Sequence, residues 1–89
     1  MKLSENFVLK NIAGTTVVMP VGEAVGKING MIKLNPTAKV IWEALEANKD
    51  FDGILADVKS SFEDVDDANL SEDVNDFLNK LREHEILID

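Results

Sequence analysis

The chain has 89 residues, 45% of them hydrophobic, and a formal net charge of −8 at pH 7, which fits a single folded domain over residues 1–89. It has no cysteine and one histidine, His84, which excludes disulfides, thiolate nucleophiles and sites built from cysteines or several histidines. The acidic balance disfavours nucleic acid and anionic lipid as partners. Without a membrane-spanning run or a recognisable signal peptide, we expect a cytoplasmic protein that uses no metal or cofactor.

The first half of the chain predicts β-strands. Residues Phe7–Ile12 alternate in the manner of a strand, with Phe7, Leu9 and Asn11 on one face. A turn signal at 13–15 separates this strand from the β-branched run Thr16–Met19, and the two strands predict a hairpin. Pro20 cannot donate to a ladder, so it should mark the end of pairing or an unpaired edge position.

The segment after the hairpin reads as a loop. Gly22 and Gly26 lie within the loop-like run Val21–Lys27. Asn29-Gly30 is the strongest short turn signal of the chain, because both residues accept positive φ cheaply. It either joins a short arm to the next strand or bends the chain into that strand, and a tight turn is favoured over a ligand-contacting loop.

The run Met31–Trp42 joins the β part of the chain to the α part. Met31, Ile32 and Leu34 make a short apolar strand, and Asn35 is a favourable N-cap for a helix. Pro36 falls at the first helical position, where its missing N–H costs nothing. If this strand lies at a sheet edge, another chain can pair with it.

Three helices are expected in the second half. The first runs from about Pro36 to Glu46, and we expect Trp42, beside its apolar stripe, to be a core or rim aromatic rather than a base-stacking one. Asp50 caps the second helix and the third runs from about Asp67 to Glu83. Helical spacing predicts one apolar face on each of these two helices. On the second helix this face carries Phe51, Ile54, Leu55, Val58 and Phe62. On the third it carries Leu70, Val74, Phe77, Leu78 and Leu81.

Two charged features have plain structural interpretations. The acidic run 63–67 lacks the ligand spacing and central glycine of a calcium loop, so we interpret it as an interhelical turn with Asp66 as N-cap. His84 follows Lys80 and Arg82 near a helix C-terminus, where cations complement the helix dipole. The tail 85–88 should return to pack on the sheet.

Strands followed by three helices predict an α+β fold. We expect a small antiparallel sheet of about three strands, with helices packed on one face of it. The last two helices, joined by the acidic turn, look like a helix-turn-helix pair, and the sheet would then be the wing of a winged helix-turn-helix domain.

Several runs of this sequence resemble the PqqD family, which comprises pyrroloquinoline-quinone (PQQ) synthesis protein D and related precursor-peptide recognition elements. The runs are FVLKNIAG, VVMPVGEA, INGMIKLNPTAKVIWEAL and DVNDFLNKLREHEILI, and they cover most of the chain. The most specific parts are Leu34-Asn35 before a helix that carries Trp42, and the motif Asp73-Val74-x-x-Phe77-Leu78-x-x-Leu81. Many relatives are expected to have a glycine near position 85, whereas this chain has His84-Glu85.

The resemblance implies a non-catalytic adaptor. Such proteins bind the leader of a ribosomally made precursor peptide and present it to a modifying enzyme, often a radical S-adenosylmethionine (radical SAM) enzyme. The leader adds as an antiparallel strand to the edge of the third strand, beside the third helix. By position, the pairing strand is Met31, Ile32, Lys33 and Leu34, and the third helix forms the wall of the groove. On that helix we expect Leu70, Val74 and Phe77 to be the apolar groove contacts, with a place in the core as the alternative for some of them. The acidic third helix favours leaders that carry Lys or Arg.

Two alternative functions fit the sequence less well than a peptide-binding adaptor. A winged-helix DNA-binding transcription regulator fits the fold class, but Glu72, Asp73 and Asp76 would oppose the approach of the third helix to phosphates. A stand-alone enzyme would depend on carboxylates of solvated faces, and nothing in their spacing indicates a pocket that would perturb them. An exposed strand edge also favours self-association, so a homodimer is expected as a possible partner state.

Overall fold

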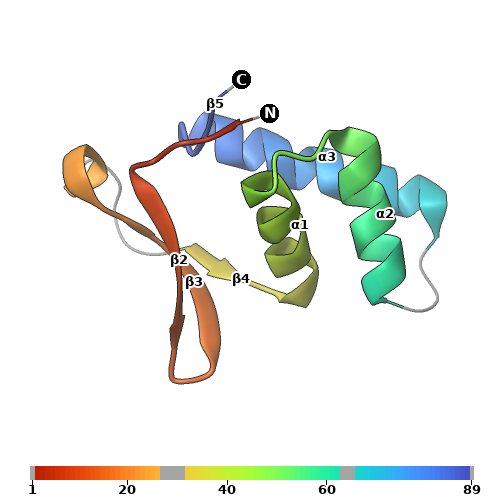
Figure 1. Ribbon diagram of the computed structural model, residues 1–89, viewed down its shortest axis with the longest axis horizontal. Coiled ribbons are helices and arrows are strands. Elements are labelled where there is room, and N and C mark those ends of the chain that lie inside the picture. Colours follow the sequence, from red (N-terminus) through yellow and green to blue (C-terminus); the bar gives the residue numbers. More distant parts are fainter. Residues whose placement is uncertain (1, 27–31, 63–65, 89) are drawn as a thin grey trace.

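The computed structural model describes residues 2–26, 32–62 and 66–88 (Figure 1). The predicted turn at Asn29-Gly30, the predicted strand residue Met31 and the acidic residues 63–65 lie outside the described residues. The elements follow in the order β1 (Lys2–Leu3), β2 (Phe7–Ile12), β3 (Thr15–Pro20), a 3-10 turn η1 (Gly22–Ala24), β4 (Ile32–Leu34), α1 (Pro36–Glu46), α2 (Phe51–Ser61), α3 (Asp67–Glu83) and β5 (Leu87–Ile88).

The hairpin of β2 and β3 forms as predicted. The two strands pair antiparallel from Phe7 opposite Pro20 to Ile12 opposite Thr15. The turn between them has φ of +51° at Ala13 and +82° at Gly14. Positive φ at both central residues is the geometry that matches the right-handed twist of a two-residue hairpin, although alanine adopts it less readily than glycine.

The main sheet has the strand order β2-β3-β4. Its inner face carries Phe7 of β2, Val18 of β3 and Leu34 of β4, all three of which belong to the hydrophobic core. Leu9 and Ile32, on the same face, are half-buried and pack against that core. The alternation expected for Phe7–Ile12 is therefore confirmed, because side chains two residues apart in a strand lie on the same face.

The two ends of the described chain form a second sheet that the sequence did not predict. β1 pairs antiparallel with β5, with Leu3 opposite Leu87, and the Ser4 N–H donates to the Ile86 carbonyl oxygen at 2.7 Å (Figure 1). The tail therefore pairs with β1, whereas it was expected to pack on the main sheet. A two-residue strand is too short to show any periodicity, so only the folded chain reveals this pairing.

The helix boundaries follow from their caps. The Asn35 side chain accepts a hydrogen bond from the Ala38 N–H at 2.8 Å, and Asp50 accepts one from the Gly53 N–H at 2.8 Å. At the start of α3, Asp66 accepts from the Ala68 N–H at 3.1 Å. Each cap satisfies an N–H that has no partner within its helix, so the three predicted helix starts are confirmed.

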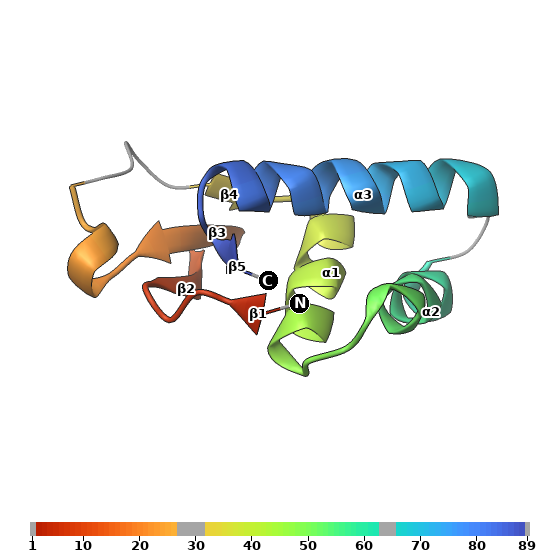
Figure 2. The ribbon, with the colours of Figure 1, turned by 90° about the horizontal axis from the view of Figure 1, so that it is seen from above.

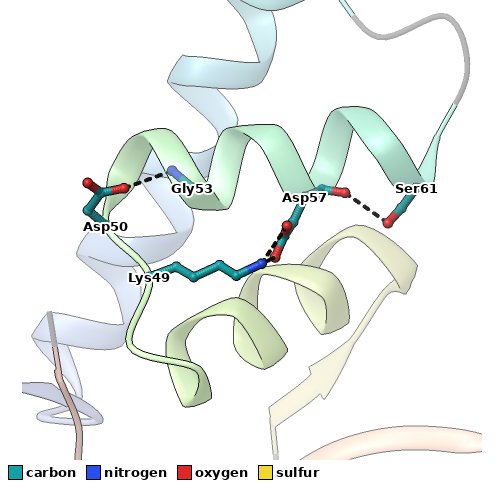
Figure 3. A network of polar contacts seen from close by, with 5 residues as sticks. All are labelled: Lys49, Asp50, Gly53, Asp57 and Ser61. Carbon is teal, nitrogen blue, oxygen red and sulfur yellow. Dashed lines mark hydrogen bonds and ion pairs between the residues drawn. The ribbon is translucent and has the colours of Figure 1, made fainter.

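A charged contact links the segment between α1 and α2 to α2 itself. Lys49 Nζ lies 2.8 Å and 2.7 Å from the two carboxylate oxygens of Asp57, as Figure 3 shows. Both side chains are partly exposed, so the pair contributes at most about 1 kcal/mol. Its effect is to hold the segment that carries the Asp50 cap close to the middle of α2.

The core combines residues from the three helices, the inner face of the main sheet and the C-terminal tail. In both ribbon views α1 lies between the main sheet and α2 (Figures 1 and 2). Trp42 of α1 is 1% exposed and joins the core, as expected of a core aromatic. A buried indole N–H usually finds a hydrogen-bond partner, but among the described residues Nε1 of Trp42 has none. Packing therefore holds this ring in place.

The α+β class is confirmed, since small antiparallel sheets are combined with three helices that follow the main sheet in the chain. The winged helix-turn-helix arrangement stays a prediction. Within the described ranges, none of the helices combines the length and the apolar character needed to cross a membrane.

The Asn35 cap can be tested by an alanine substitution. Asn35→Ala removes the acceptor for the Ala38 N–H, and we expect the free energy of unfolding to fall by about 1 kcal/mol. Urea denaturation followed by circular dichroism measures this loss. The matched control is Asn75→Ala, an exposed position within α3, where alanine should leave stability unchanged or slightly raised. Equal losses in both variants would contradict the capping role.

Candidate functional site

The candidate site begins at the edge of the main sheet. β4 pairs with β3 on one side, and its other side faces no strand among the described residues. β4 ends at Leu34, and the cap residue Asn35 leads directly into α1. The β4 edge of the sheet therefore ends at the start of a helix, which distinguishes it from the opposite edge at β2.

The register of the hairpin shows which backbone groups of β3 point toward β2. Ile12 and Thr15 flank the two-residue turn and form a hydrogen-bonded pair, as the ends of a tight turn do. Hydrogen-bonded pairs recur at every second residue of an antiparallel ladder, so Val17 also points its backbone groups toward β2. Val21 continues the alternation, since its N–H donates to the Asn6 carbonyl oxygen at 2.7 Å.

The remaining residues of β3 point their backbone groups the other way, toward β4. Thr16 lies opposite Leu34, and Val18 lies opposite Ile32, so these are the hydrogen-bonded pairs between the two strands. Lys33 lies between them and must point its N–H and C=O away from β3. The backbone of Lys33 is therefore the donor and acceptor that β4 offers at the open edge.

The side chains of β4 divide between the two faces of the sheet. Ile32 and Leu34 turn to the inner face and join the hydrophobic cluster. The Lys33 side chain is exposed and shares the outer face with Val17. Any strand added to this edge would continue the same alternation, with every second side chain turned toward the helices.

A groove lies beside the end of β4, between α1 and α3. One depression of about 200 Å³ is lined by Asn35, Thr37, Ala38, Ile41, Asp73 and Phe77. A second, of about 390 Å³, continues toward the end of α2 and is lined by Thr37, Val58, Phe62, Asp66, Asn69, Leu70 and Asp73. Thr37 and Asp73 line both, so the two depressions adjoin, and we call them together the α1–α3 groove.

The size and lining of the α1–α3 groove suit peptide side chains. Pockets for drug-sized ligands span roughly 300–1,000 Å³, and both depressions lie near or below the lower end of that range. Figure 2 places α3 and β4 along the same side of the molecule. An extended chain paired with β4 would therefore run along the edge into the groove.

The electrostatic character of the groove is acidic. Its charged lining residues within the described chain are Asp66 and Asp73, both exposed. The Asp66 carboxylate is already engaged, because it caps α3 and accepts from Asn69 Nδ2 at 3.1 Å. Outside the groove, the described acidic residues and His84 form no group of three that could hold a metal ion.

The structure separates the residues that the resemblance pointed to. Lys33 and Ile32 lie at the open edge and Phe77 is half-buried in the groove lining. Leu34 and Leu70 are 8% and 5% exposed, so each offers a ligand little surface, although Leu70 lines the groove. Val74 is 0% exposed and serves the core. Met31 lies outside the described residues.

Sequence reasoning missed two groove residues, Thr37 and Asp73, as candidate ligand contacts. Asp73 lies one turn before Phe77 and one turn after Leu70, so the helical spacing alone placed it on the same face. That signal was overlooked because Asp73 was considered for its charge and as part of the family motif, but not as a groove residue. Thr37 has no such signal, since its neighbours in the groove come from α2 and α3.

An open strand edge beside an apolar groove is typical of modules that bind an extended peptide. The comparisons with known proteins agree with this class. The family described as coenzyme PQQ synthesis protein D (PqqD) matches residues 7–87, so the chain belongs to the PqqD family, and the predicted membership is confirmed. The comparison with curated proteins gives no match.

One solved structure shares the fold. TbiB1 in complex with the TbiA(beta) leader peptide has a TM-score of 0.77 to this chain at 24% sequence identity. The likeness covers 100% of this chain and 100% of that chain.

The assignment of the Lys33 backbone can be tested with proline. Because the Lys33 N–H points away from β3, Lys33→Pro should lower the free energy of unfolding by less than about 1 kcal/mol. Ile32→Pro removes a ladder donor and should cost on the order of 1–3 kcal/mol more than Ile32→Ala, which controls for the lost side chain. Chemical denaturation of the three variants and the wild type measures both differences. A larger backbone cost at Lys33 than at Ile32 would reverse the assignment.

Proposed function

We propose that this protein is a non-catalytic adaptor that binds the leader of a ribosomally made precursor peptide by strand addition at β4. The observation that carries the proposal is the outward-facing backbone of Lys33 at an open edge that leads into the α1–α3 groove. Membership of the PqqD family supports it, and so does the fold shared with TbiB1, which was solved with a leader peptide bound.

Strand addition uses the edge in two ways. The Lys33 N–H and C=O pair with one residue of the leader, which lies antiparallel to β4, and main-chain hydrogen bonds of this kind supply affinity that does not depend on leader sequence. The leader residues on either side of that pair lie opposite Ile32 and Leu34, so their side chains turn to the inner face, where Phe77 lines the groove. Apolar residues at these two leader positions would bury surface and supply selectivity.

The adaptor then presents the bound leader to a modifying enzyme. We propose a peptide-modifying partner of the radical SAM class, by analogy with the family, and a cytoplasmic location for the pair. The product of the pathway would be PQQ or another modified peptide. The chain itself would contribute binding and orientation, since strand addition needs no nucleophile or metal ion.

The DNA-binding alternative receives less support. A helix that reads the major groove must lie close to phosphates, and Lys or Arg contacts supply most of that affinity. In α3 the exposed side chains of Glu72, Asp73 and Asp76 would repel the phosphates. The groove that Asp73 lines suits a peptide better than a nucleic acid backbone.

Leader binding can be followed by amide chemical shifts. We expect a synthetic leader of the cognate precursor peptide to shift amide signals of Ile32–Leu34 and of α3 in two-dimensional ¹⁵N spectra. Lys33→Pro should weaken binding at least tenfold because it removes the edge donor, whereas Lys33→Ala keeps the donor and should bind within about threefold of the wild type.

Two results would contradict the proposal. One is a set of shifts confined to β2 or to the outer face of the sheet. The other is equal affinity of the proline and alanine variants for the leader, because main-chain pairing at Lys33 would then contribute nothing.

Self-association should use the same edge. An unpaired strand is a template for a second copy of the chain, so we expect a monomer–dimer equilibrium in sedimentation experiments at high protein concentration. Saturating leader and the Lys33→Pro variant should each shift the equilibrium toward monomer, because both occupy or remove the pairing donor. A dimer that persists in both conditions would show that copies associate through another surface.

A further inference from the structure

The orientation of the α1–α3 groove fixes which part of a bound leader reaches it. Asn35, the residue after the last residue of β4, lines the nearer depression, and the farther one extends to Phe62 and Asp66. A leader that runs antiparallel to β4 has its N-terminal side next to Leu34. The leader residues just N-terminal of the paired strand are therefore the ones that enter the groove.

Asp73 is the acidic residue that the two depressions of the groove share. It lines both depressions and is exposed, and among the described residues its carboxylate has no hydrogen-bond or ion-pair partner. Asp66, by contrast, accepts from the Ala68 N–H and from the Asn69 side chain. An incoming cation would therefore meet Asp73 as an unengaged acceptor, with Asp66 adding negative potential farther along.

The surface around Asp73 suits the stem of a long basic side chain. Phe77 and Ile41 line the groove on one side of Asp73, and Phe62, Leu70 and Val58 line it on the other. Lys and Arg side chains lay their methylene stems on apolar surface of this kind while the charged end stays in contact with water. No Lys, Arg or His is part of the lining within the described residues.

We infer that the α1–α3 groove selects leaders that carry a Lys or Arg immediately N-terminal to the strand-forming residues, with its stem on the apolar lining and its charge on Asp73. This inference rests on the proposed function and adds to it a position and a chemical class. It differs from a general attraction to the acidic helix, since a basic residue on the C-terminal side of the paired strand would lie away from Asp73.

The test is a selection of random dodecapeptides by mRNA display against the full chain. We expect binders of the wild type to be enriched in Lys or Arg at a constant spacing N-terminal to an alternating apolar segment. The same enrichment should appear with Asp76→Asn and disappear with Asp73→Asn. Both substitutions remove one negative charge from α3, but Asp76 is exposed and lines neither depression.

Affinity measurements on one selected peptide complete the test. By fluorescence anisotropy, changing its basic residue to Gln should weaken binding to the wild type and to Asp76→Asn by about two- to fivefold, the range of an exposed ion pair. The change should have no effect on binding to Asp73→Asn. Moving the basic residue to the C-terminal side of the strand should weaken binding to the wild type by the same two- to fivefold factor.

The outcomes separate this inference from the function on which it rests. Binders that are lost with Lys33→Pro but show no basic preference, or a preference that both Asp variants lose equally, would overturn the inference and leave strand addition intact. Binders that tolerate Lys33→Pro, or the absence of any binder, would overturn both.

Discussion

The open edge of the sheet depends on the backbone N–H and C=O of one residue, Lys33. β3 uses alternate residues to bond β2 on one side and β4 on the other, and this alternation leaves the N–H and C=O of Lys33 directed out of the sheet. A backbone donor and acceptor that face water lose little free energy, but they gain when another strand excludes that water. The free edge is thus tolerated in the isolated chain and favourable in a complex.

The same edge carries features that limit unwanted pairing. β4 has only three residues, and Asn35 and Pro36 turn the chain into α1 directly after it. A Lys at the centre of the strand further disfavours stacking of many copies, because like charges would be brought together. Short length and charge therefore keep association reversible, which a protein that exchanges peptide partners requires.

Packing and selectivity are divided between two faces of the same helix. Val74, Leu78 and Leu81 of α3 are fully buried and hold the helix against α1 and the sheet. Asp73 and Phe77, one step away around the helix, face the groove. A helix can serve both purposes because residues three and four apart share a face, whereas adjacent residues do not. Changes in the groove residues can thus alter ligand preference with little disturbance of the core.

The local signals of the sequence determined the helices, their caps and the hairpin. Asn35, Asp50 and Asp66 cap their helices, because a cap depends only on a side chain and the N–H groups two or three residues on. The sequence and its family resemblance also pointed to β4 as the pairing strand. Tertiary structure alone decided that β1 pairs with β5, that Val74 belongs to the core, and that Thr37 meets Asp73 in one groove. These contacts join residues far apart in the chain, and periodicity records which side chains share a face but not which faces meet.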